Sequence, residues 1–135
     1  MNDPESVDIL LVEDNPNDAE LTLRALKKTN LGVRVTVARD GAEALEYLLG
    51  GRPKPKVIFL DLKLPKIDGV EVLRRARADE RTRSIPVVVI SGQGDVSKRV
   101  SEMHATFLQK PVLPEDLVAA MDQAVYSKIL ATETH

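Results

Sequence analysis

VDILLVED, residues 7–14, and VIFLD, residues 57–61, decide the fold. Each is a short apolar, β-branched run, typical of a strand buried on both faces of a parallel sheet, and each ends in acidic residues. Glu13, Asp14 and Asp61 are therefore expected at one sheet edge, where open α/β sheets bind ligands. Three carboxylates in one crevice repel one another unless a cation lies among them, and oxygen ligands alone favour Mg²⁺ over zinc or copper.

Size and composition limit the classes of protein to consider. A chain of 135 residues fits one domain with one core, so residues 1–135 are expected to form a single domain without an output domain. The net charge of −2 gives no electrostatic case for binding nucleic acid or a membrane surface. There is no cysteine, no secretory signal and no apolar run of about 20 residues, so a cytoplasmic protein is expected.

Hydrophobic periodicity and turn residues predict alternating strands and helices. Strands are expected at about 7–13, 33–38, 56–61, 85–90 and 105–109. Helices are expected at about 16–29 and 41–49, after Asp68, after Asp95 and from Leu113. This alternation predicts a doubly wound, five-stranded parallel sheet with right-handed crossovers. In the flavodoxin-like order 2-1-3-4-5, the first and third strands are neighbours at the switch point, which brings the three acids together.

Two further polar residues end predicted strands. Ser91 closes the fourth strand and Lys110 follows the fifth, so a hydroxyl and a cation join the acids. This set of side chains suits a phosphoryl group. A carboxylate can act as the nucleophile, while magnesium, the ammonium and the hydroxyl bind the phosphoryl oxygens. Asp61 is the central candidate because it follows the most hydrophobic strand and precedes a proline-containing loop. Each residue alone has an ordinary structural explanation, and it is their joint placement that favours a site.

The motifs LLVEDNP, LDLKLPKIDG, VVVIS and LQKP occur in this order. Together they resemble the receiver domains of two-component response regulators, over about residues 7–130. The resemblance implies that the chain takes phosphate from a sensor histidine kinase, with Mg²⁺ as the cofactor, and signals by a surface conformational change rather than acting as an enzyme. It assigns Asp61 as phosphoacceptor and metal ligand, Glu13, Asp14 and the main-chain carbonyl of Lys63 as further metal ligands, and Ser91 and Lys110 as phosphoryl-binding residues.

The same resemblance implies a switch. Ser91 is paired with an aromatic residue three positions before the lysine, here Phe107, which would rotate inward when phosphate draws the serine hydroxyl. A static core role for Phe107 is an equally good interpretation. The family also implies a cis peptide between Lys110 and Pro111.

One segment departs from the family pattern. Ser91 and Lys110 are 19 positions apart, a few fewer than usual, and Met103-His104-Ala105 replaces the usual Gly-Ala before the fifth strand. The fourth helix is therefore expected to be short or distorted. This change falls on the surface through which the family signals, and the predicted phosphoacceptor chemistry is less affected.

Longer stretches look most like stand-alone receivers paired with bacterial phytochromes. ILLVEDNPNDAELTLRALKKTN at 9–30 and DGAEAL at 40–45 carry this likeness, so a bacteriophytochrome is the candidate kinase. Because no output domain is expected, the downstream partner is expected to be another protein. The apolar last helix suggests a homodimer, although its stripe fits a core role equally well.

Two alternatives belong to other functional classes. The chain could be an interaction module whose regulation does not use phosphorylation, because the shortened segment has lost the switch. A haloacid-dehalogenase-like phosphatase also uses a strand-end aspartate with magnesium, but it usually needs a second aspartate where Lys63 stands. Rossmann and P-loop nucleotide binding are excluded because neither glycine signature follows the first strand.

Overall fold

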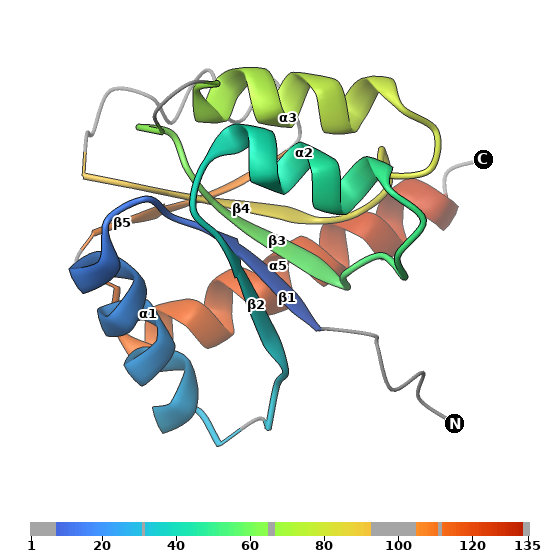
Figure 1. The fold of residues 1–135 in the computed structure, drawn as a ribbon. Coiled ribbons are helices and arrows are strands. Elements are labelled where there is room, and N and C mark those ends of the chain that lie inside the picture. Colours follow the sequence, from blue (N-terminus) through green and yellow to red (C-terminus); the bar gives the residue numbers. More distant parts are fainter. Residues whose placement is uncertain (1–7, 31, 65–66, 93–104, 111, 134–135) are drawn as a thin grey trace.

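The computed structural model describes residues 8–30, 32–64, 67–92, 105–110 and 112–133. Five strands form one parallel sheet in the order β2-β1-β3-β4-β5 (Figure 1). The strands are β1 (Ile9–Val12), β2 (Val35–Ala38), β3 (Val57–Asp61), β4 (Val87–Ser91) and β5 (Thr106–Gln109). The predicted strand order and the flavodoxin-like fold class are both confirmed.

Helices cover both faces of this sheet. They are α1 (Pro16–Lys28), α2 (Gly41–Leu49), α3 (Gly69–Ala78) and α5 (Pro114–Glu133). In Figure 1, α2 and α3 lie above the strands, α1 lies at the lower left, and α5 passes behind the strands. Side chains of α1 and α5 belong to the same core cluster. The helix expected after Asp95 falls within 93–104, outside the described residues, as does the predicted cis peptide at Pro111.

The alternation of strand side chains divides the core into two halves. In β1, Ile9 and Leu11 join the cluster that contains side chains of α1 and α5, while Leu10 and Val12 join the cluster that contains side chains of α2 and α3. All residues of β1, β3 and β4 are buried, because each face of the sheet has its own helical layer. This explains why these strands read as continuous apolar runs. In the part of the chain that the structure describes, no helix is long and apolar enough to cross a bilayer.

Side-chain caps fix where three helices begin. The Asn15 side chain accepts hydrogen bonds from the Asn17 and Asp18 main-chain N–H groups before α1, and Pro16 occupies the first turn, as the sequence predicts. Asp40 and Asp68 cap α2 and α3 in the same way. Each cap contributes about 1 kcal/mol of stability. These helices follow β1, β2 and β3, so the caps also hold the loops at the carboxyl edge of the sheet.

The strand bounds differ from the prediction by one or two residues, most at the first, second and fourth strands. β1 covers Ile9–Val12 rather than 7–13. β2 begins at Val35 rather than 33, and β4 runs from Val87 to Ser91 rather than from 85 to 90. Before β4, the Ile85 N–H donates to the Thr82 carbonyl in a turn, and Pro86 has no N–H to enter the ladder. At the other end of β4, Ser91 is the last residue of the strand, as expected.

Candidate functional site

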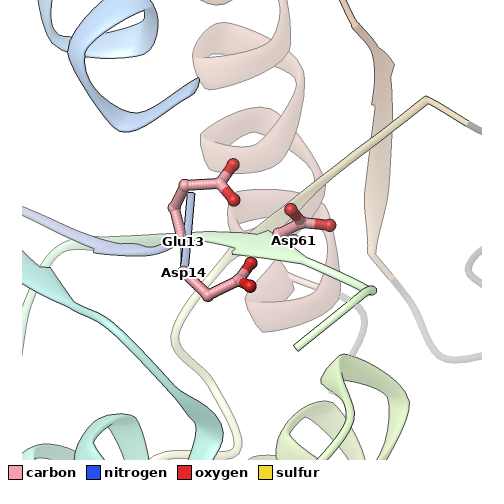
Figure 2. Close-up of side chains that lie close together, drawn as sticks. All are labelled: Glu13, Asp14 and Asp61. Atoms are coloured by element: carbon pink, nitrogen blue, oxygen red, sulfur yellow. The ribbon is translucent and has the colours of Figure 1, made fainter. Parts of the chain in front are cut away.

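Three carboxylates meet at the carboxyl edge of the sheet. Val12 in β1 is in register with Leu60 in β3, so the residues that follow them lie side by side. Glu13, Asp14 and Asp61 each offer an oxygen within 4.8 Å of the others, and Figure 2 shows the three side chains gathered at the ends of the two strands. Glu13 is 4% exposed and Asp61 6% exposed, whereas Asp14 is open to solvent. The predicted convergence of the acids is confirmed.

This acidic group is chemically suited to a hard divalent cation. The donors are carboxylate oxygens without sulfur or imidazole, and they approach one another more closely than like charges favour. Burial raises the pKa of Glu13 to about 7, and the neighbouring Asp61 carboxyl adds to this effect while Lys110 opposes it. A cation among these oxygens would favour the charged forms, so the donor set fits a metal such as Mg²⁺.

Lys110 lies among the acids. It follows β5, and its main-chain N–H donates to the Ser91 carbonyl at 3.0 Å, which fixes the backbone beside the end of β4. Its ammonium donates to Glu13 Oε1 at 3.0 Å, Asp61 Oδ2 at 3.0 Å and Asp18 Oδ2 at 2.8 Å. Burial disfavours the charge, but the three carboxylates outweigh it and raise the pKa of Lys110 above its usual value. The side chain is therefore a fixed cation at neutral pH.

Asp18 is the site residue that sequence reasoning missed. It stands in the first turn of α1, three residues after the cap Asn15, where acidic residues are common because they favour the helix N-terminus. In the sequence it therefore reads as an ordinary helix residue. The signal that could have found it is its position in the same turn that follows the first strand, at the edge where Lys110 was expected.

Two backbone contacts shape the segment after the acceptor candidate. The Lys63 main-chain N–H donates to Asp61 Oδ1 at 2.9 Å, so it orients the carboxylate. The Gly69 N–H donates to the Leu62 carbonyl at 3.0 Å. A β-carbon on Gly69 would lie 2.3 Å from the Asp61 carbonyl oxygen and 2.6 Å from the Leu62 α-carbon. Only glycine lets the start of α3 pack this closely against the end of β3.

Ser91 and Phe107 lie where the strand pattern predicts. Ser91 is 1% exposed at the end of β4 and is in register with Gln109. Phe107 is partly buried in β5 and packs against the core half that α2 and α3 cover. This placement is compatible with both the static and the switching interpretation of Phe107. The metal-binding role of the Lys63 carbonyl likewise stays a prediction.

Known proteins share this sequence and fold. The family model of the response regulator receiver domain matches residues 9–122. A probable methanogenesis regulatory protein, FilR2 of Methanothrix harundinacea (strain 6Ac), is 41% identical over 85% of this chain and 79% of its own length. By contrast, the chain spans about half, 49%, of the length of the response regulator MprA of Mycobacterium ulcerans (strain Agy99), at 37% identity over 86% of this chain.

Two solved structures of bacteriophytochrome response regulators are also similar. RtBRR is 42% identical, with a TM-score of 0.82, over 88% of this chain and 78% of that one. AtBRR is 43% identical, with a TM-score of 0.79, over 88% of this chain and 92% of that one. The family match, these identities and the acids and lysine at the strand ends agree. The chain belongs to the response regulator receiver domain family.

Proposed function

We propose that Asp61 accepts a phosphoryl group from a sensor histidine kinase, with Mg²⁺ held by Glu13, Asp14 and Asp61. The observation that carries this proposal is the contact of the Lys110 ammonium with the buried carboxylates of Asp61 and Glu13. That arrangement places a nucleophilic oxygen, a fixed cation and metal-binding oxygens at one point of the sheet edge.

The transfer itself needs little covalent chemistry from the protein. An Asp61 oxygen forms a bond to phosphorus as the phosphorus–nitrogen bond of a phosphohistidine breaks. The electron pair of the broken bond leaves with the imidazole, which departs neutral because its other nitrogen carries a proton. When bound, Mg²⁺ neutralises charge on the phosphoryl oxygens.

The chain's own residues orient the acceptor and bind the product. The Lys63 N–H engages Asp61 Oδ1, and Lys110 engages Oδ2, so the carboxylate has one orientation, while each oxygen keeps a further lone pair for attack. In the phosphorylated state Lys110 pairs with a phosphoryl oxygen and the Ser91 hydroxyl binds another. Phe107 then rotates toward the space that Ser91 leaves, and this changes the surface that a downstream protein recognises.

The kinase in this proposal is a bacteriophytochrome. Support comes from the similarity to RtBRR and AtBRR, which are bacteriophytochrome response regulators by their names. A homodimer through α5 stays a prediction.

A mass measurement tests the phosphoacceptor assignment. Incubation with MgCl₂ and acetyl phosphate should add one phosphoryl group to the wild-type protein, measured by intact mass spectrometry. Asp61→Asn should abolish the gain because an amide is a poor nucleophile. Asp68→Asn is a matched control: it changes an acid at the start of α3, which Asn caps equally well, and it should retain the gain. The proposal fails if the wild type gains no mass or if Asp61→Asn gains the same mass.

A further inference from the structure

We propose that Asp18 is a positioning residue for phosphoryl transfer, which holds the Lys110 ammonium at the edge of the acidic group throughout the reaction. This inference rests on the proposed phosphoacceptor function and adds a residue that the predicted metal and phosphoryl-binding set does not contain. It follows from the contacts of one ammonium group.

The Lys110 ammonium is fully engaged. It has three N–H donors, and three carboxylate oxygens lie within hydrogen-bond distance, of which Asp18 Oδ2 is the nearest at 2.8 Å. Hydrogen bonds between charged groups are about twice as strong as neutral ones. The lysine side chain is 21% exposed and that of Asp18 35% exposed, so solvent screens this pair less than a surface pair.

The three carboxylates that contact Lys110 have different roles in the proposed reaction. Glu13 and Asp61 belong to the group that would hold the cation, and Asp61 would also carry the phosphoryl group. Asp18 is not in that group, so neither the metal nor the phosphoryl group competes for its carboxylate. It is the one contact of the three that Lys110 can keep in every state.

The backbone of Asp18 is also held. Asn15 accepts its main-chain N–H at 3.2 Å in the capped first turn of α1. Lys110 reaches the site on a flexible four-carbon stem from the end of β5. Without Asp18, the ammonium would have Glu13 and Asp61 as its remaining carboxylate partners. It would then lie deeper among the oxygens that bind the cation and would no longer be held where the phosphoryl oxygens arrive.

A double-mutant cycle separates this role from a general effect on the fold. The initial rate of phosphorylation by acetyl phosphate would be measured for the wild type, Asp18→Asn, Lys110→Ala and the double variant across a range of MgCl₂ concentrations. Asp18→Asn should slow phosphorylation about tenfold, as expected for one lost charge-assisted hydrogen bond. It should also raise the half-saturating Mg²⁺ concentration. In the Lys110→Ala background, Asp18→Asn should alter the phosphorylation rate and the half-saturating Mg²⁺ concentration less than about twofold, because the ammonium that Asp18 contacts is absent.

Glu20→Gln is the matched control. Glu20 lies on the exposed side of the same helix and pairs with Arg24, so its variant should keep the wild-type rate. A wild-type rate for Asp18→Asn, or equal slowing in both backgrounds, would overturn the positioning role. If a thermal melt shows that Asp18→Asn is not folded, Asp18→Ser takes its place in the same double-mutant cycle, with the same expected outcomes. Absence of phosphorylation in the wild type would instead contradict the proposed function itself.

Discussion

At the scale of single residues, the candidate acceptor has almost no freedom. One Asp61 oxygen accepts the Lys63 N–H and the other accepts the Lys110 ammonium. Its main-chain carbonyl faces Gly69 at the start of α3, too close for a side chain. The position of the carboxylate is therefore set by Lys63, Gly69 and Lys110 as well as by β3 itself.

Gly69→Ala tests this close packing. The new methyl group would meet the backbone of Asp61 and Leu62, which cannot rotate away, so the end of β3 or the start of α3 must move. We expect a loss of about 2 kcal/mol in the free energy of unfolding, from urea denaturation, and slower phosphorylation of the folded fraction. Gly51→Ala is the control because a β-carbon at that position would meet nothing within 4 Å, and it should change neither quantity. Equal effects of the two substitutions would contradict the argument.

At the scale of elements, Asp8 joins β1 to both of its neighbours at the end of the sheet away from the acids. Its carboxylate accepts the Arg34 main-chain N–H at 2.8 Å before β2 and lies 3.0 Å from the Lys56 ammonium before β3. Its main-chain carbonyl accepts the N–H groups of Lys56 and Val57. The hydrogen bond from Arg34 lowers the pKa of Asp8, against the effect of burial, and Lys56 lowers it further.

This lowered pKa predicts a pH-dependent contribution to stability. The folded state favours the carboxylate, so the stabilisation is complete above the unfolded pKa of about 4 and is lost as pH falls through the folded value. Asp8→Asn should therefore cost about 1 kcal/mol at pH 7, and the difference from the wild type should shrink as the pH falls below about 4. Urea denaturation at each pH measures it. Glu46→Gln, which removes a carboxylate on the exposed face of α2, is the control and should match the wild-type stability at pH 7. A pH-independent difference for Asp8→Asn would contradict the prediction.

At the scale of the whole molecule, the sequence predicts the sheet better than the side-chain contacts across it. Apolar runs and strand-end acids are local patterns, and the parallel topology then brings Glu13 and Asp61 together. The contact of Asp18 with Lys110 spans 92 residues and uses an acid that a helix start explains by itself. The close packing of Gly69 against the backbone of Asp61 and Leu62 likewise depends on tertiary structure. In the sequence, Asp-Gly before a helix indicates only a cap.

Cation binding should be visible in the stability of the whole domain. A ligand that binds only the folded state raises its stability with concentration, so added MgCl₂ should raise the Tm and a chelator should reverse the rise. Asp14→Asn should reduce this rise while leaving the metal-free Tm near the wild-type value, because Asp14 is exposed and is not among the acids that contact Lys110. Thermal melts with and without Mg²⁺ measure both. If Mg²⁺ raises the Tm of Asp14→Asn as much as that of the wild type, Asp14 is not a ligand of the metal.

The separation in sequence between Lys110 and the acids also affects the order in which the site forms during synthesis. Glu13 and Asp61 meet once β3 pairs with β1, but the ammonium that neutralises them is 97 residues from Glu13 and arrives only when β5 adds at the sheet edge. A partly formed sheet would thus hold buried acids without their counter-charge, which disfavours such an intermediate. Addition of the last strand is then electrostatically coupled to the first. The ability to accept phosphate would consequently report that the sheet is complete.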